Sequence, residues 1–220
     1  MRHFDVITFD CYGTLVDWEA GMAAAFRDTA AEDGVTLDPA TVLRILFDTS
    51  PAAEAREYRS YRDILTDAAV RVARHLGWAI SRERAAFLPE SVSLWRPFQD
   101  ANPTLERLAR AGYQLGILSN VDDDLLDATR RHFTVAFDLI VTAQQVRSYK
   151  PARGHFATAR GRIAPRRWLH AAQSYVHDIV PAVAQNIPVA WINRKGERVT
   201  GAAWPDWEFR TLAELADWLA

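Results

Sequence analysis

The sequence predicts an α/β fold in which a doubly wound, mostly parallel, Rossmann-like sheet carries an inserted helical cap domain. Two observations predict it. Short apolar runs alternate with helical patterns through the last two-thirds of the 220 residues, and the first third after the opening strand is almost wholly helical. Such alternation is typical of βαβ units, whose right-handed crossovers build a parallel sheet. We therefore expect the α/β core at residues 1–16 and 97–220 and the cap at residues 17–96.

The opening strand is expected at Asp5–Phe9, an apolar run that leads directly into Asp10. Amphipathic helices are then expected at Glu19–Gly34, Pro39–Phe47, Ala52–Leu76 and Ser81–Leu94. Asp38 and Ser81 are suited to cap the second and fourth helices, and glycines close the first and third. This helical block between the first strand and the rest of the sheet is the predicted insertion.

The remaining elements alternate in type. Asn102 is expected to cap a helix that has Pro103 at its first position and ends at Gly112. Strands are expected at Gln114–Leu118, Asp138–Thr142, Trp168–Ala172 and Pro188–Ile192, and helices at Asp122–His132, Gly154–Ile163, Ile179–Asn186 and Leu212–Leu219. The strands are short and apolar, as in a parallel sheet that is covered on both faces.

Composition narrows the class of protein. The 26 basic and 28 acidic residues leave a net charge of −2, which gives no electrostatic basis for binding nucleic acid or an anionic membrane. A single cysteine fits a reducing compartment. The first residues lack the apolar segment of a signal peptide, and no apolar run approaches the roughly 18 residues of a membrane span. We therefore expect a cytoplasmic protein with neither nucleic acid nor membrane as a partner.

Polar side chains follow the predicted strands, where α/β sheets bind their ligands. They are Asp10, Ser119, Asn120, Lys150 and Asp178. Each has a structural explanation when taken alone: a turn residue, two side chains that satisfy a strand end, a solvated cation and a helix cap. Their joint occurrence at successive strand ends instead predicts a catalytic site.

The order of these motifs resembles that of the haloacid dehalogenase superfamily of hydrolases. The matching stretches are FDCYGTL, LSN, SYKP and HDIVP, and the helical insertion matches the cap of that family in position. The resemblance covers the whole predicted core. It implies hydrolysis through a covalent intermediate, and it specifies the superfamily better than it specifies a substrate.

The resemblance implies a role for each motif residue. Asp10 is the expected nucleophile, and Lys150 keeps it ionised, since a nearby cation favours a carboxylate. Asp178 is expected to position or deprotonate the water that hydrolyses the ester. Thr14, together with Ser119 and Asn120, is expected to hold the carboxylate or to bind the anionic part of the substrate.

The residue type at position 12, two residues after the nucleophile, distinguishes branches of this superfamily; here it is Tyr12. Phosphatases generally carry an acid two residues after the nucleophile, which protonates the leaving alcohol, and a phenol is too weak an acid for that role near neutral pH. A halide leaves without a proton. FDCYGTL therefore resembles the L-2-haloacid dehalogenase branch, which implies no metal and no cofactor. The expected substrate is a small 2-substituted carboxylate, and a magnesium-dependent phosphatase or a silent binding protein is the rival.

A closer resemblance, carried by FDCYGTLVDWE, YRDIL and AQSYVHD, is to hydrolases that open the ring of L-azetidine-2-carboxylate. Their leaving amine is already protonated, so this alternative also needs no second acid. Tyr12, Trp18 and Tyr61 are expected to contact substrate, by cation–π attraction in this alternative, or else simply to pack the cap. Cys11 is either a further substrate contact or a small buried hydrophobe. The family also implies a homodimer.

Overall fold

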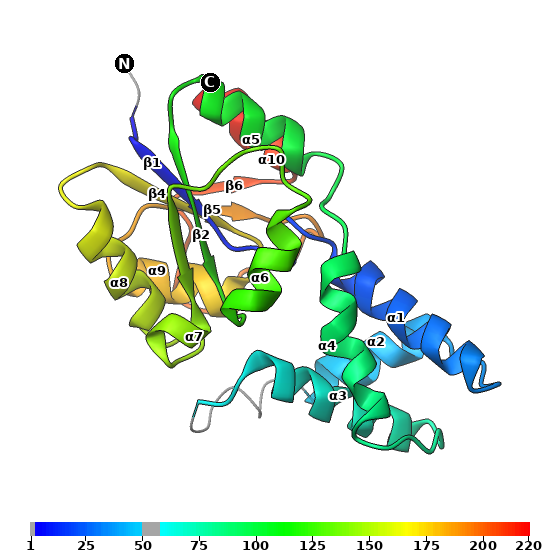
Figure 1. Cartoon of the computed structure of the whole chain (residues 1–220). Coiled ribbons are helices and arrows are strands. Elements are labelled where there is room, and N and C mark those ends of the chain that lie inside the picture. The colour runs from blue at the N-terminus through cyan, green and yellow to red at the C-terminus, as the bar shows by residue number, and fades with distance from the viewer. Residues whose placement is uncertain (1–2, 50–57) are drawn as a thin grey trace. The chain divides into compact units, whose positions relative to one another are not determined.

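The computed structural model describes residues 3–49 and 58–220, and Figure 1 follows the chain through its elements. The chain divides into two compact units. The α/β unit comprises residues 1–16, 97–120 and 131–220, and the helical unit comprises residues 17–96 and 121–130. The segment 121–130, which the sequence assigns to the core, thus groups with the helices.

The α/β unit is built on one parallel sheet, which confirms the predicted fold class. Its strands are β1 (Val6–Phe9), β2 (Gln114–Ser119), β3 (Leu139–Thr142), β4 (Trp168–Ala172), β5 (Val189–Ile192) and β6 (Trp207–Phe209). Within the described residues their order is β3-β2-β1-β4-β5-β6, and every neighbouring pair is parallel. The direction in which strands are added reverses between β1 and β4, and such a reversal point is where doubly wound folds bind ligands.

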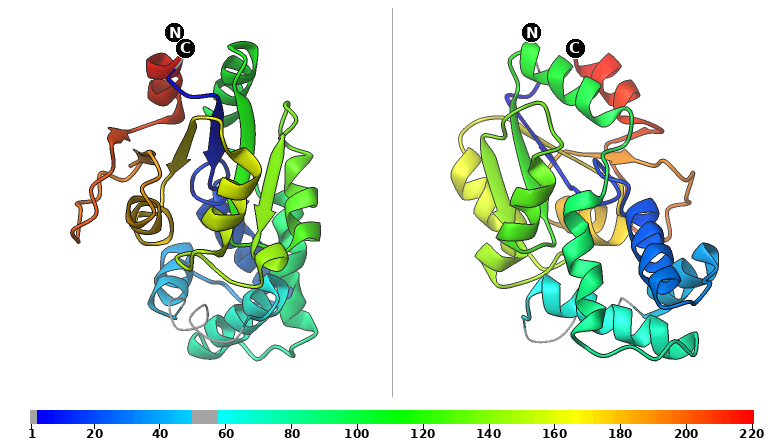
Figure 2. Two further views of the ribbon diagram at one scale, coloured as in Figure 1. Left: turned by 90° about the vertical axis from the view of Figure 1, so that its left-hand side faces the viewer. Right: turned by 45° about the vertical axis from the view of Figure 1, so that its right-hand side comes forward.

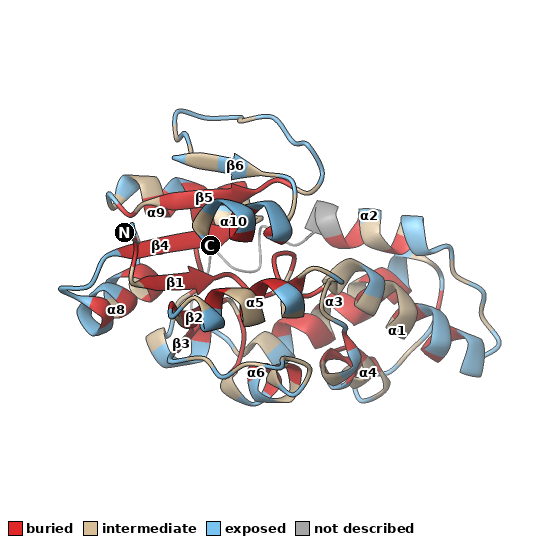
Figure 3. Ribbon diagram, turned by 90° about the horizontal axis from the view of Figure 1, so that it is seen from above, coloured by how far each residue is buried: buried red, intermediate tan, exposed pale blue. Residues whose placement is uncertain are grey.

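Helices cover both faces of this sheet. The helices α5 (Ala101–Arg110) and α10 (Leu212–Leu219) pack against each other on one face, and α8 (Gly154–Ile163) and α9 (Val180–Ala184) lie on the other (Figures 1 and 2). A short helix, α7 (Ala143–Val146), follows β3. Because both faces are covered, β1, β2, β4 and β5 are almost wholly buried (Figure 3), which explains why they appear as continuous apolar runs in the sequence.

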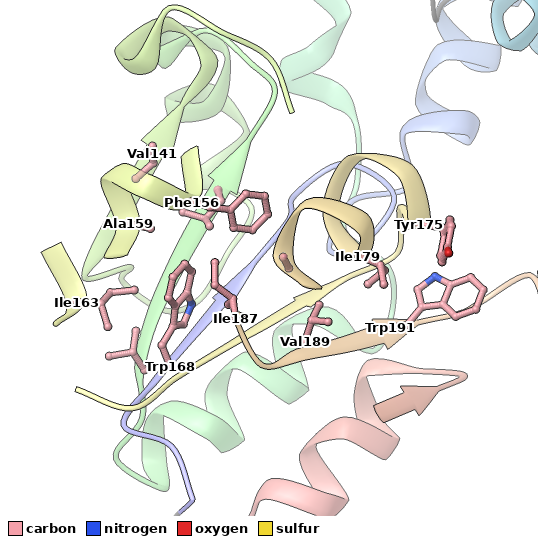
Figure 4. Packing of buried hydrophobic residues seen from close by; sticks show 13 residues of the cluster. Val141, Phe156, Ala159, Ile163, Trp168, Tyr175, Ile179, Ile187, Val189 and Trp191 are labelled. Atoms are coloured by element: carbon pink, nitrogen blue, oxygen red, sulfur yellow. The ribbon is translucent and has the colours of Figure 1, made fainter. Parts of the chain in front are cut away.

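One hydrophobic cluster fills the space between the sheet and α8 (Figure 4). Phe156 and Ile163 of α8 belong to it together with Trp168 of β4, and Val189 and Trp191 of β5 extend it along the sheet. The ring centroids of Phe156 and Trp168 lie 6.5 Å apart, with the ring planes tilted by 33°. This packing holds β4 in place against α8, and β4 carries part of the site described below.

Two features of the α/β unit differ from the predictions. The strand β6 was not predicted, because it has three residues, none of them fully buried; Trp207 and Phe209 instead contact the ring of Trp218. The helix α5 begins at Ala101 and not after Asn102. The Asn102 side chain is used to hold a distant loop, since it donates to the His132 carbonyl at 2.9 Å.

The helical unit contains α1 (Trp18–Glu32), α2 (Pro39–Thr49), α3 (Tyr61–His75), α4 (Phe87–Ser91) and α6 (Asp123–Arg130). No helix among the described residues is long and apolar enough to cross a membrane. The expected helix Ala52–Leu76 lies partly outside the described residues, and α3 starts only at Tyr61 because the Ser60 hydroxyl accepts from the Asp63 N–H. The expected helix Ser81–Leu94 is broken into α4 and two 3₁₀ turns around it.

Asp122 explains why α6 groups with the helical unit. The acidic run after Asn120 suggests a cap for its own helix, but the Asp122 carboxylate instead accepts from the N–H groups of Tyr61 and Arg62 at 3.0 and 2.9 Å. It therefore caps the N-terminus of α3, where a carboxylate is favoured by the helix dipole. An ion pair between Arg62 and Asp124 joins the same two helices.

The packing of α1 depends on a glycine. A Cβ at Gly21 would lie 2.4 Å from two atoms of the Trp95 ring, which is itself buried. A Cβ at Gly161, in the last turn of α8, would meet nothing within 4 Å. Both glycines lie within helices, and they differ in whether a side chain lies opposite them.

Alanine at these two positions is expected to have opposite effects on stability. Gly161→Ala should raise the free energy of unfolding by about 0.5–1 kcal/mol, because alanine loses less chain entropy in a helix. Gly21→Ala should lower it by about 1–3 kcal/mol, because the methyl group overpacks against Trp95. Urea unfolding followed by circular dichroism measures both, and equal stabilisation by the two variants would contradict this packing.

Candidate active site

The loop after β1 places Asp10 at the reversal point of the sheet. The loop turns back at once, since the N–H groups of Leu15 and Val16 both donate to the Cys11 carbonyl at 2.8 and 2.9 Å. Gly13 has φ of 97°, a conformation in which a side chain would be strained. The glycine in the motif therefore allows the turn that leaves Asp10 at the carboxyl end of β1.

Both oxygens of the Asp10 carboxylate are held from within the α/β unit. The Thr14 hydroxyl donates to Oδ2 at 3.0 Å, and the Lys150 ammonium donates to Oδ1 at 2.8 Å. Thr14 is fixed in turn, because its hydroxyl accepts from the Gln173 N–H at 2.9 Å. Its carbonyl accepts from Arg194 at 2.9 Å. The predicted contact of Thr14 with the carboxylate is thus present.

Lys150 is the centre of the site. Its side chain is 1% exposed, and its three protons have three acceptors: Asp10 Oδ1 at 2.8 Å, Asp178 Oδ1 at 2.6 Å and the Leu118 carbonyl at 2.9 Å. A buried ammonium is tolerated only when it is paired and fully hydrogen-bonded. The two acids that the sequence predicts at separate strand ends are therefore brought together by one cation.

Asn120 holds the backbone of Lys150. Its amide nitrogen donates to the Lys150 carbonyl at 3.0 Å, and its amide oxygen accepts from the Lys150 N–H at 2.6 Å. This pair of bonds fixes the loop after α7 against the end of β2. The contacts of Asn120 in this structure thus position the lysine, and its predicted contact with a substrate anion stays a prediction.

Ser119 ends β2 next to Asn120 and is fully buried. Its carbonyl accepts from His155 Nε2 at 3.0 Å, and burial followed by the charge of Lys150 lowers the pKa of that imidazole to about 3. Among the residues that the structure describes, none makes a hydrogen bond to the Ser119 hydroxyl. A buried hydroxyl of this kind is available to a ligand.

The sequence suggests that Asp178 stands at the end of a strand. In the structure it lies in a π-helix and contacts Lys150 from there. Residues Tyr175–Ile179 form this turn after β4. The Ser174 hydroxyl caps it by accepting from the His177 N–H at 3.2 Å, and the Ile179 N–H donates five residues back to the Ser174 carbonyl. Single π turns are frequent at functional sites because they redirect one side chain.

A chain of buried hydrogen bonds continues behind Asp178. His170 Nε2 lies 3.0 Å from Asp178 Oδ1, and His170 Nδ1 lies 2.9 Å from the Thr8 hydroxyl. The Trp168 indole N–H donates to the same hydroxyl at 2.7 Å. The sequence analysis missed these residues, although a histidine and a threonine inside two otherwise apolar strands are the signal that could have found them.

The surroundings shift the pKa values of the two acids in opposite directions. Burial raises the pKa of Asp10, with the Asp178 charge acting in the same direction and Lys150 opposing both. Burial also acts to raise the pKa of Asp178, but Lys150 and the His170 hydrogen bond outweigh it and bring that pKa down to about 2. For Lys150, burial is outweighed by the two carboxylates and its pKa is raised. Two ionised carboxylates and one ammonium together carry one excess negative charge.

The four predicted substrate contacts fall in both units. Cys11 is fully buried in the α/β unit, and burial together with the Asp10 charge raises the pKa of its thiol. Tyr12 follows in the same loop, where it pairs with Val16. Trp18 and Tyr61 are the first residues of α1 and α3 in the helical unit. Their contacts with substrate stay predictions.

Within residues 3–49 and 58–220, no group of three or more His, Cys, Asp or Glu is arranged to hold a metal ion. Asp10 and Asp178, the two acids of the site, face the Lys150 ammonium.

Known proteins resemble this chain in sequence and in structure. An (S)-2-haloacid dehalogenase of Pseudomonas putida is 26% identical over 223 residues, which cover 100% of this chain and 98% of the relative. The crystal structure of a defluorinating L-2-haloacid dehalogenase superposes with a TM-score of 0.84 at 23% identity, over 98% of this chain and 95% of that one.

A third comparison is with the L-2-haloacid dehalogenase of Xanthobacter autotrophicus with chloropropionic acid covalently bound. Its TM-score is 0.81 at 20% identity, and 97% of each chain is covered. These structures share the fold of the present chain. The family model for haloacid dehalogenase-like hydrolases matches residues 4–184, which include every motif of the site. The chain therefore belongs to the haloacid dehalogenase-like hydrolases.

Proposed function

We propose that this hydrolase is a 2-haloacid dehalogenase that converts a small (S)-2-halocarboxylate to the 2-hydroxycarboxylate with inversion at C2. The observation that carries the proposal is the buried group in which Lys150 Nζ lies 2.8 Å from Asp10 and 2.6 Å from Asp178. The (S)-2-haloacid dehalogenase of Pseudomonas putida, which this chain matches over its full length, supports the choice of substrate.

In the first half-reaction Asp10 is the nucleophile. One carboxylate oxygen of Asp10 forms a bond to C2 of the substrate, and the carbon–halogen bond breaks so that the halide leaves with its electron pair. Thr14 and Lys150 hold the carboxylate in place before the attack, which reduces the entropy cost of reaching the reactive geometry. The covalently bound chloropropionic acid in the Xanthobacter autotrophicus structure supports an intermediate of this kind.

In the second half-reaction Asp178 activates water. Water attacks the ester carbonyl carbon of Asp10 while Asp178 accepts a proton from it; the ester carbon–oxygen bond then breaks, and the departing alkoxide takes up that proton. The reaction consumes one water and releases the hydroxy acid, the halide and a proton. The buried Ser119 hydroxyl, which has no hydrogen-bond partner among the described residues, is the proposed contact of the substrate carboxylate.

Tyr12 argues against the phosphatase alternative. It occupies the position of the acid that protonates a leaving alcohol, and an ordinary phenol with a pKa near 10 does not supply that proton at neutral pH. A halide needs no proton. We further propose that the enzyme acts in the cytoplasm as a homodimer, which the single cysteine and the family resemblance suggest.

A substrate panel separates the possible activities. Both enantiomers of 2-chloropropionate are assayed for halide release, beside L-azetidine-2-carboxylate and p-nitrophenyl phosphate with and without Mg²⁺. We expect halide release from the (S) enantiomer, undiminished by a metal chelator. Turnover of the phosphate alone, and only with Mg²⁺, would instead assign a phosphatase, and turnover of azetidine-2-carboxylate alone would assign the ring-opening activity.

Isotope labelling tests the covalent intermediate. A single turnover in ¹⁸O-labelled water, with enzyme in excess over (S)-2-chloropropionate, is expected to place the label in Asp10 and to leave the first product unlabelled, because water attacks the carboxyl carbon of Asp10. Peptide mass spectrometry locates the label. Label found directly in the first product would exclude Asp10 as the nucleophile.

Asparagine at Asp10 and at Asp178 is expected to abolish turnover but to change stability in opposite directions. The folded pKa of Asp178, about 2, lies below its ordinary 3.8, so its charge stabilises the fold above pH 3.8 and this stability is lost as the pH falls through about 2. Asp178→Asn should therefore lose about 2 kcal/mol at pH 7.

The raised pKa of Asp10 has the opposite sign. The fold favours the protonated form, and that contribution to stability is lost as the pH rises through the raised value, so at pH 7 the carboxylate carries a cost. Asp10→Asn removes this cost and should be at least as stable as the unmodified protein. Urea unfolding of both variants at pH 7 measures the difference, and equal destabilisation would contradict the assignment.

A further inference from the structure

We propose that His170 is a positioning residue for ester hydrolysis: through a hydrogen-bond chain from Trp168 and Thr8, it holds Asp178 so that one carboxylate oxygen stays free for water. This inference rests on the proposed function and assigns a role to residues outside the sequence motifs. The inference is based on buried contacts between side chains of β1 and β4 and Asp178.

The direction of the hydrogen bonds follows from the chemistry of the groups. An indole N–H can only donate, so the Thr8 hydroxyl accepts from Trp168. The single hydroxyl proton of Thr8 is then available for His170 Nδ1, which lies 2.9 Å away. With Nδ1 as the acceptor, the imidazole carries its proton on Nε2 and donates to Asp178 Oδ1 at 3.0 Å.

The sheet register holds this chain in place. Thr8 and His170 are paired residues of the neighbouring parallel strands β1 and β4, and Trp168 stands two residues before His170 on the same face. All three side chains are buried. The Phe156 ring meets the imidazole edge to face at 5.1 Å, which restricts its rotation. Contacts from β4, from the neighbouring strand β1 and from α8 therefore hold the histidine in place.

The result is an asymmetric carboxylate at Asp178. Its Oδ1 accepts from both Lys150 Nζ and His170 Nε2. Its Oδ2 is buried and accepts no hydrogen bond from any group that the structure describes. Two donors on one oxygen fix the rotation of the carboxylate, and a buried carboxylate oxygen still requires a partner. A water molecule that donates to Oδ2 is positioned to lose a proton to it.

The inference predicts that loss of His170 slows one half-reaction only. Asp10 does not contact His170 in this network, so formation of the ester and release of halide should proceed at the unmodified rate. Hydrolysis of the ester should fall roughly 10- to 100-fold, by analogy with the range found when a hydrogen-bond partner that orients a metal ligand is removed. The Asp10 ester should therefore accumulate.

Rapid-quench turnover of (S)-2-chloropropionate by the full-length protein tests this prediction. Halide release and 2-hydroxypropionate formation are followed separately, and the intact protein is weighed by mass spectrometry. For His170→Phe we expect a halide burst of one equivalent per active site, slow product formation, and protein that carries a propionate adduct. His170→Gln, which retains a donor, should restore part of the hydrolysis rate.

Thr8→Val keeps the inference testable if His170→Phe does not fold. It is nearly isosteric and removes the donor to Nδ1 together with the acceptor of the Trp168 indole N–H. Hydrolysis should slow roughly 2- to 10-fold, as expected when the neutral hydrogen bond to the imidazole is lost. Tyr113→Phe is the matched control: it removes another buried hydroxyl of the α/β unit, which donates to the Leu219 carbonyl at 2.8 Å. It should leave both rates unchanged.

Two results would overturn the inference while leaving the proposed function intact. One is ester hydrolysis at the unmodified rate in folded His170→Phe and Thr8→Val. The other is an equal slowing of both half-reactions, which would indicate a general disturbance of the fold. The absence of halide release from the unmodified protein would refute the proposed function, and this inference with it.

Discussion

The buried ammonium of Lys150 is the interaction on which the site depends. Two carboxylates and one ammonium have left water together, and each charge alone would cost several kcal/mol to bury. The cost is offset because every proton of the ammonium has an acceptor and both acids have further donors from the protein. Removal of the cation would leave two like charges in an apolar interior, so the site can exist only with the lysine in place.

The sheet brings these three groups together although they are far apart in the chain. Asp10 follows β1, Asp178 follows β4 next to it, and Lys150 comes from the segment after β3. Because the carboxyl ends of parallel strands meet at one edge, residues 10, 150 and 178 converge without a long loop having to be ordered. The Asn120 amide completes the arrangement, since it ties the lysine backbone to the end of β2.

Some features of this molecule could be predicted from its sequence and others could not. The parallel sheet could be predicted, because covered strands leave continuous apolar runs between helices. Asp10 could be predicted because it follows a buried strand directly. Lys150 and Asp178 could be predicted only from their motifs, since Lys150 follows α7 and Asp178 lies in a π turn. The π turn under Asp178 could not, since nothing in Tyr175–Ile179 separates it from an α-helix start. Neither could the cap that Asp122 provides, because its partner helix α3 lies about 60 residues away in the sequence.

His170 was missed for a related reason. A histidine in the middle of an apolar strand is read as a core residue, and its contacts with Thr8 and Asp178 depend on which strand lies beside it. Strand order is a property of the whole sheet. Side chains that act through a neighbouring strand are therefore less visible in a sequence than those that stand at the end of their own strand.

The hydrogen bonds to Asp178 lower its basicity and at the same time fix its orientation. The donors on Oδ1 lower the pKa of this acid to about 2, which makes it a weak base. A base of that strength accelerates ester hydrolysis only if the water is held at the right place, because little driving force for proton transfer is left. The same donors that weaken the base also fix its rotation. In the proposed mechanism Asp10 loses its charge when it is esterified, and Lys150 then faces Asp178 alone, so the need for precise placement is greatest in that intermediate.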